Sequence, residues 1–299
     1  MTHGMRAVDG VHVLAAGIGF TEGPVAWGDD AVVVTSMTRG LLYRVDLGTG
    51  ETHLLAEPGG GPNGLAVATD GALVVAQSGG HVMPTRSEVP VQASIQHVLD
   101  GEVSTLTMDV NSPSDCVIGT DGRFWFTDPA DHALDTPTRN GDVRVLDLTS
   151  GTVSTVLSGL SFPNGIAFGA DPSELYVAET SARCIRRYRV NGDHVTADGW
   201  VAEMPTGHPD GIALDAAGWL WVAGSTGANL VAFDPDGHMA HEITFEAGHL
   251  VTSLCFAGPD LSTMIITSPK GGTVYSVPAL HPGLPLPVRR NAPVPNNAP

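Results

Sequence analysis

Six polar residues recur along the chain at intervals of 41 to 51 residues, and each one opens a short apolar run. They are Glu22, Asn63, Ser114, Asn164, Asp210 and Thr252. If a repeating fold places equivalent residues at equivalent positions, these side chains converge. Two carboxylates and two carboxamides then offer the hard oxygen ligands that suit Ca²⁺, Mg²⁺ or Mn²⁺. The pattern predicts a site for a cation or a polar ligand.

A simpler explanation of the same residues is turn formation, because Asn-Gly and Asp-Gly pairs favour tight turns. It accounts for Asn63, Asn164 and Asp210, each of which precedes a glycine. It does not account for Glu22, since glutamate has no special role in turns and a buried carboxylate needs a partner. We favour the binding site, and turn formation stays open as the alternative.

The apolar runs indicate strands rather than helices. A second run, rich in β-branched or aromatic residues, follows a turn in every repeat, as at 73–76 and 124–127. Third and fourth runs follow, as at 41–46 and 51–55. A period of about 40 to 50 residues with four strands per unit is typical of propeller blades. We therefore predict an all-β fold, a six-bladed β-propeller of four-stranded blades.

The two ends of the chain complete this prediction. Residues near 11–16 resemble a fourth blade strand, so we expect this N-terminal strand to close the ring against the last blade and remove an exposed sheet edge. We assign residues 1–280 to a single six-bladed propeller. Residues 281–299 are rich in proline and are expected to form a weakly ordered C-terminal tail.

Composition excludes several classes of protein. The 14 Lys and Arg against 32 Asp and Glu give a net charge of −18, and no basic run exists to neutralise a phosphate backbone. No apolar run approaches the roughly 20 residues that span a bilayer, and the first residues lack a signal-peptide pattern. Three cysteines without paired spacing fit a reducing compartment. We expect a cytoplasmic monomer that acts on a small-molecule substrate, without nucleic-acid or membrane partners.

Several motifs, in blade order, resemble one known family. They are FTEGPVAW at 20–27, SPSDC at 112–116, DGRFWFTDP at 121–129, FPNGIAF at 162–168, LYVAET at 175–180 and PDGIALD at 209–215. Together they resemble the senescence marker protein/gluconolactonase/luciferin-regenerating enzyme family over roughly residues 15–280. The resemblance implies a six-bladed propeller with one divalent cation at the channel mouth, and in most members the hydrolysis of lactones.

Carried over residue by residue, the resemblance makes Glu22, Asn164 and Asp210 the metal ligands. Ca²⁺ is the first expected cation, and Mg²⁺, Mn²⁺, Zn²⁺ and Fe²⁺ are the other candidates. The family commonly has Pro-Asn-Asp where this chain has Pro-Ser-Asp at 113–115. The shorter Ser114 is expected to reach the cation only through water, or to leave space for a different substrate.

For the reaction, we assign activation of the attacking water to Asp210, because a carboxylate at the edge of a metal can orient and deprotonate water. Asn63 and Ser114 are expected to hydrogen-bond the substrate. A long loop at 80–97 carries apolar residues, which together with the missing asparagine favour a substrate less polar than a free sugar lactone. Those residues are Val82, Met83, Val89 and Val91.

Three further residues are candidate substrate contacts. Asp128 ends a strand of the third repeat, just before a second long loop at 129–140, although a strand-end turn explains an aspartate there equally well. His81 lies in the first long loop, and His208 lies in the segment that leads to Asp210. A histidine could shuttle protons, and an exposed loop histidine without function is the alternative for each.

Other functions remain as alternatives. An organophosphate or other ester hydrolase would use the same metal site. A propeller that binds a ligand or another protein without catalysis would not need the metal ligands. Neither would a metal-free relative similar to strictosidine synthase, with Glu179 as its base. Because Glu22 and Asp210 are both present, we favour the metal-dependent lactone hydrolase.

Overall fold

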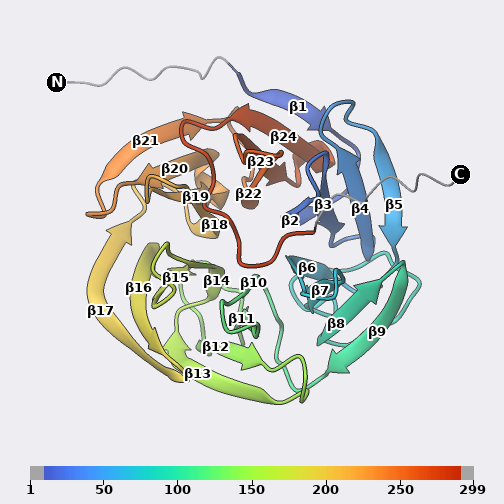
Figure 1. Cartoon of the computed structure of the whole chain (residues 1–299), viewed down its shortest axis with the longest axis horizontal. Coiled ribbons are helices and arrows are strands. Elements are labelled where there is room, and N and C mark those ends of the chain that lie inside the picture. The colour runs from blue at the N-terminus through green and yellow to red at the C-terminus, as the bar shows by residue number, and fades with distance from the viewer. Residues whose placement is uncertain (1–9, 291–299) are drawn as a thin grey trace, which may run out of the picture.

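The computed structural model describes residues 10–290, where 24 strands form six four-stranded antiparallel sheets around a central channel (Figure 1). Blade one contains β2 (Thr21–Trp27), β3 (Ala31–Ser36), β4 (Leu41–Asp46) and β5 (Thr52–Ala56). Blade two contains β6 (Pro62–Val67), β7 (Leu73–Gln77), β8 (Ser94–Leu99) and β9 (Glu102–Thr107). Blade three contains β10 (Cys116–Ile118), β11 (Phe124–Asp128), β12 (Gly141–Leu146) and β13 (Val153–Leu160).

The second half of the ring repeats this arrangement. Blade four contains β14 (Pro163–Phe168), β15 (Glu174–Glu179), β16 (Cys184–Asn191) and β17 (His194–Glu203). Blade five contains β18 (Pro209–Leu214), β19 (Leu220–Gly224), β20 (Asn229–Phe233) and β21 (Met239–Thr244). Blade six contains β22 (Ser253–Ala257), β23 (Thr263–Ser268), β24 (Thr273–Pro278) and, as its outermost strand, β1 (His12–Ala15).

The N-terminal strand closes the ring, so the predicted six-bladed propeller is confirmed. In β1, His12 pairs with Ser276 and Val13 pairs with Tyr275 of β24. This antiparallel pairing covers the edge that β24 would otherwise expose.

The hydrophobic core is divided among the blades. Six clusters of buried side chains each fill the space between two neighbouring sheets. Trp125 of blade three packs with Val177 of blade four, and Trp221 of blade five packs with Met264 of blade six. The second strand of a blade is covered on both faces, which explains why its apolar run is continuous rather than alternating.

The segment after β24 crosses the ring, as Figure 1 shows. We call residues 281–290 the strap. Leu284 N donates to Leu214 O at the end of β18 (2.9 Å), and the Arg290 guanidinium lies 3.9 Å from the ring centroid of Trp27 at the end of β2. These residues therefore differ from the expected weakly ordered tail, whose other part, 291–299, lies outside the described residues.

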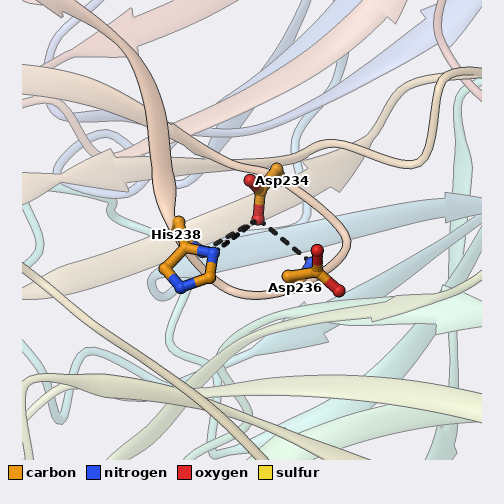
Figure 2. A group of neighbouring side chains, drawn as sticks. All are labelled: Asp234, Asp236 and His238. Carbon is orange, nitrogen blue, oxygen red and sulfur yellow. Dashed lines mark hydrogen bonds and ion pairs between the residues drawn. The ribbon is translucent and has the colours of Figure 1, made fainter.

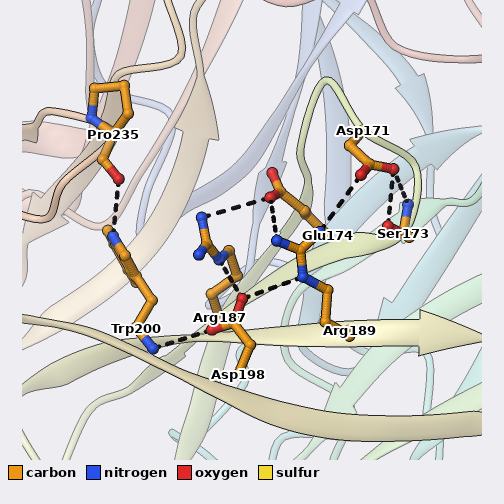
Figure 3. A network of polar contacts seen from close by, with 8 residues as sticks. All are labelled: Asp171, Ser173, Glu174, Arg187, Arg189, Asp198, Trp200 and Pro235. Atoms are coloured by element: carbon orange, nitrogen blue, oxygen red, sulfur yellow. Dashed lines mark hydrogen bonds and ion pairs between the residues drawn. The ribbon is translucent and has the colours of Figure 1, made fainter.

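Paired charges join β15, β16 and β17 of blade four (Figure 3). Arg187 Nε lies 2.6 Å from Asp198 Oδ2, and Arg189 Nη2 lies 3.0 Å from Glu174 Oε1. The arginines of β16 are thus matched by carboxylates of the same sheet. Within residues 10–290, no helix has the length and apolar character needed to cross a bilayer.

Candidate active site

The six polar residues lie at the start of the inner strands or just before them, and glycines let these strands approach closely. A Cβ on Gly23 would lie 2.2 Å from Asn63 O, and a Cβ on Gly165 would lie 2.3 Å from Asp210 O. In addition, Gly64 N donates to Ser114 O at 2.7 Å. The glycine after the polar residue therefore allows the inner strands of neighbouring blades to come into contact. Turn formation alone does not explain this close approach.

Four of the polar side chains form a hydrogen-bonded chain. Asn63 Nδ2 donates to Ser114 Oγ at 3.1 Å, and Ser114 Oγ donates to Asn164 Oδ1 at 3.1 Å. The side chain of Asn164 in turn hydrogen-bonds the carboxylate of Asp210. The Ser114 hydroxyl thus connects the carboxamide of Asn63 in blade two to that of Asn164 in blade four. Its short side chain is therefore already hydrogen-bonded to protein groups.

The carboxylates at the channel mouth lack a cationic partner. Burial, and then the charges of Asp210 and Asp115, raise the pKa of Glu22 well above its usual value. Burial and then Asp115 likewise raise the pKa of Asp210. No cation within residues 10–290 acts on either group. A bound dication would relieve this repulsion, so the donor set fits the metal that the sequence predicts.

Asp115 is the residue that sequence reasoning missed. Burial raises its pKa to about 7, although the backbone N–H groups of Cys116 and Ile166 hydrogen-bond its carboxylate. The signal was present in the repeats: the residue after the polar position is glycine in four blades, and the exceptions are Asp115 and Ser253. Both of these residues border the space enclosed by the inner strands.

Thr252 departs from the pattern of the other polar residues. Its Oγ1 donates to Thr21 O at 2.9 Å and lies 2.9 Å from Thr267 Oγ1. Its side chain therefore joins blade six to blade one and does not extend the hydrogen-bonded chain at the mouth.

A cleft of about 620 Å³ lies beside the mouth. Its lining residues are His81, Val110, Asn111, Ser112, Pro129, Ala130, Asp131, His132, Thr138 and Arg139. The loop at 78–93 supplies His81, and the loop at 129–140 supplies most of the opposite wall. The lining is rich in hydrogen-bonding groups.

The apolar residues of the first loop do not line this cleft. Val89 and Val91 lie against Gly59, where an added Cβ would come within 2.8 Å of both side chains. The cleft therefore gives no support to the expectation of a substrate less polar than a sugar lactone.

Asp128 lies behind the cleft wall. Its carboxylate is fully buried and accepts hydrogen bonds from Asn111 N (3.0 Å) and Ser112 N (2.8 Å). Arg144 Nη1 lies 3.1 Å away and completes a buried ion pair. The structure does not bring Asp128 to the surface of the cleft. Its carboxylate instead holds the backbone of Asn111 and Ser112, which do line the cleft.

The histidines have different surroundings. The buried His208 lies 2.7 Å from Thr226 Oγ1 through Nδ1 and 3.3 Å from Asp135 Oδ1 through Nε2, so it links blade five to the loop at 129–140. His132 packs edge-on against Phe162, and burial lowers its pKa to about 4. His132 is therefore neutral near pH 7.

A separate acidic group lies in the turn between β20 and β21. Asp234, Asp236 and His238 place ligand-type atoms within 4.8 Å of one another (Figure 2). Asp234 Oδ1 accepts hydrogen bonds from Asp236 N (3.0 Å) and His238 N (2.9 Å). These bonds are those of an aspartate that stabilises a tight turn, and they account for the group without a metal.

The fold and the site define a class: a six-bladed propeller whose channel mouth carries hydrogen-bonded carboxamides beside carboxylates that have no cationic partner among residues 10–290. The family model for the SMP-30/gluconolactonase/LRE-like region matches residues 20–270, so the chain belongs to this family.

Individual relatives agree with this assignment. The chain is 32% identical to pentonolactonase XacC of Haloferax volcanii over 265 residues, covering 84% of this chain and 81% of the relative. It is 25% identical to the gluconolactonase of Zymomonas mobilis over 301 residues, covering 86% and 78%. The structure of regucalcin from Agrobacterium tumefaciens, described as a calcium-binding protein, superposes with a TM-score of 0.73 at 18% identity over 94% and 97% of the two chains.

Proposed function

We propose that the protein hydrolyses lactones at the channel mouth with the help of one divalent cation. The observation that carries this proposal is the pair of carboxylates, Glu22 and Asp210, held in a mostly buried ring with no cationic side chain of residues 10–290 near them. Relatives named pentonolactonase and gluconolactonase support the reaction type.

Glu22, Asn164 and Asp210 would hold the cation, and Ca²⁺ is the first candidate because all three offer oxygen ligands. When bound, the cation supplies Lewis-acid polarisation of the lactone carbonyl. Ser114 Oγ donates to Asn164 Oδ1 and fixes the orientation of that carboxamide. The side-chain hydrogen bond from Asn164 in turn orients the carboxylate of Asp210.

Asp210 acts as the general base in this proposal. Its carboxylate takes a proton from water as the water oxygen bonds to the carbonyl carbon. The bond between that carbon and the ring oxygen then breaks, and the proton passes to the departing oxygen, which gives an open-chain hydroxy acid. Burial strengthens each of these charge interactions because the local dielectric constant is low.

The cleft beside the mouth favours a polyhydroxylated lactone. Its walls offer Asn111, Ser112, Thr138 and two histidines, groups that can hydrogen-bond hydroxyls. His81 and neutral His132 are proposed as substrate contacts, together with Asn63 at the mouth. His208 supports the loop at 129–140 from behind through Asp135.

The test is proton release from a panel of pentono- and hexonolactones, with alkyl-substituted γ-lactones for contrast. We expect turnover that a chelator abolishes and one divalent ion restores, with a preference for the hydroxylated rings. Full turnover after chelation would refute the metal dependence, and turnover of none of the lactones by metal-loaded protein would refute the reaction.

A further inference from the structure

A second cavity lies inside the ring, behind the polar mouth. This inner cavity has a volume of about 280 Å³ and is bounded by the inner strands of the blades and, at the far end, by the strap. Its walls are mainly apolar and include Leu65, Ile118, Ile166, Leu214 and Phe256, with Leu286 of the strap. The cleft described above shares none of these residues.

The end of the inner cavity nearest the mouth carries two polar side chains, Asp115 and Ser253. They come from blades three and six, at the position that holds glycine in the other four blades. Ser253 is only 5% exposed; its backbone carbonyl accepts a hydrogen bond from Thr267 Oγ1 (3.3 Å), and its hydroxyl has no partner within residues 10–290. Because Ser253 lines the cavity, this hydroxyl is available to hydrogen-bond a polar group placed there.

The strap borders the other end of the cavity and is held there by two anchors. On one side, His281 Nδ1 lies 3.1 Å from Asp215 Oδ2, and on the other Arg289 Nη2 donates to Gly258 O at 3.2 Å. Between the anchors, residues 285–288 line the cavity and make no hydrogen bond with the described residues. Leu286 lines the cavity and is 48% exposed, so the middle of the strap is also accessible to solvent.

We propose that the inner cavity binds an aliphatic alcohol of about ten carbon atoms, with its hydroxyl group at Ser253 and Asp115 and its chain directed toward the strap. Apolar cavities remain dry and bind hydrocarbons, and one of about 150 Å³ accepts benzene. A volume of about 280 Å³ is nearly twice as large, which sets the length of the chain. Binding in this cavity requires neither a cation nor hydrolysis, and the cleft takes no part in it; Asp115, whose charge also acts on Glu22 and Asp210, lies where the cavity meets the mouth.

The test is calorimetric titration of the full-length protein with straight-chain alcohols from 1-hexanol to 1-decanol. Affinity should rise about fourfold with each added methylene, the factor that corresponds to about 0.8 kcal/mol, and should stop rising when the cavity is full. No binding, or an affinity that does not depend on chain length, would overturn the proposal.

Two leucines of the C-terminal segment provide a matched pair of variants. Leu286→Asp places a charge at the cavity wall and should weaken 1-octanol binding at least tenfold. Leu280→Asp changes an equally exposed leucine (55%) that does not line the cavity, and should change binding less than twofold. Equal effects of the two substitutions would contradict the assignment of the site.

The hydroxyl end is tested with Ser253→Ala. Loss of one hydrogen bond, about 1 kcal/mol, should weaken 1-octanol binding about fivefold and leave n-heptane binding unchanged. Lactone turnover is measured in parallel, with and without 1-octanol. If 1-octanol competes with the lactone and its binding is unchanged by Leu286→Asp, then it binds in the cleft. That outcome would reject the inner cavity as the site.

Discussion

Asp210, near the start of the inner strand β18, and Asp215, which directly follows its end, show what distinguishes the two ends of the channel. At the mouth, the pKa of Asp210 is raised by burial and by the nearby charge of Asp115. At the far end, Asp215 is 1% exposed but accepts hydrogen bonds from Ala217 N, Trp219 N and Trp221 Nε1 (2.9, 2.9 and 3.0 Å).

The difference teaches that burial by itself does not identify a functional carboxylate. Asp215 is more deeply buried than Asp210, and its fourth partner, His281 Nδ1 at 3.1 Å, belongs to the strap. The Asp215 carboxylate thus accepts its hydrogen bonds from groups of the fold itself. Asp210 has one side-chain partner, Asn164, and faces other carboxylates. The functional candidate is the group whose charge the protein leaves uncompensated.

The largest expected effect is on kcat, and it should distinguish Asp210 from Asp215. Asp210→Asn removes the proposed base and should lower kcat for lactone hydrolysis about 10²- to 10⁴-fold without changing the β-sheet circular dichroism. Asp215→Asn should leave kcat within about threefold and lower the free energy of unfolding by about 1–3 kcal/mol, since some hydrogen bonds are lost. Comparable losses of kcat in both variants would contradict the proposed functional difference between the two ends of the channel.

A second effect concerns the close approach of strands at the mouth. Gly165→Ala should lower the free energy of unfolding by about 3 kcal/mol, because the new Cβ would lie 2.3 Å from Asp210 O and overpacking distorts the backbone. Gly48→Ala is the control, with its nearest atom, Asp46 Oδ1, at 3.5 Å. Urea unfolding measures the free energy of unfolding of both variants. Equal stability would show that the inner strands at the mouth can move apart without loss of stability.

The smallest effect is a pH dependence at the cleft. Burial lowers the pKa of His132 to about 4, with the charges of His81 and Arg139 acting in the same direction. The neutral form is favoured in the folded loop, so its stabilisation is complete above about pH 6.5 and is lost as the pH falls toward 4. At about 1.4 kcal/mol per pKa unit, the loss is at most about 3.5 kcal/mol.

Hydrogen exchange in residues 129–140 measures this loss. The amides should exchange faster at pH 4.5 than at pH 7 after correction for intrinsic rates, and His132→Gln should remove the difference. The exposed His194, at the start of β17, provides the control, since His194→Gln should leave the pH dependence unchanged. A dependence that persists in His132→Gln would assign it to another group.

The repeats predicted more of the fold than of the site. The period placed all six inner strands, because each blade needs the same apolar runs to pack against its neighbours. Asp115 was overlooked because it follows Ser114 in a motif that resembles a known one, and its significance depends on Glu22 and Asp210 lying nearby in space. The metal ligands and the base remain predictions.

The strap shows why local composition was insufficient at the C-terminus. Its prolines and small number of strand-forming residues resemble a tail, yet its order comes from partners remote in the sequence. Asp215 binds His281, and Trp27 stacks with Arg290. Contacts between residues so far apart leave no periodic pattern in the sequence that would reveal them.

Closure of the ring by β1 has a consequence for biosynthesis. His12 and Val13 of β1 are made some 260 residues before their partners in β24, Ser276 and Tyr275. At about 5–20 residues per second, the first strand waits on the order of tens of seconds for its partner. A chain released early would therefore carry an incomplete last blade and an open ring, and such exposed strand edges promote aggregation. Ring closure makes completion of translation a condition for stability.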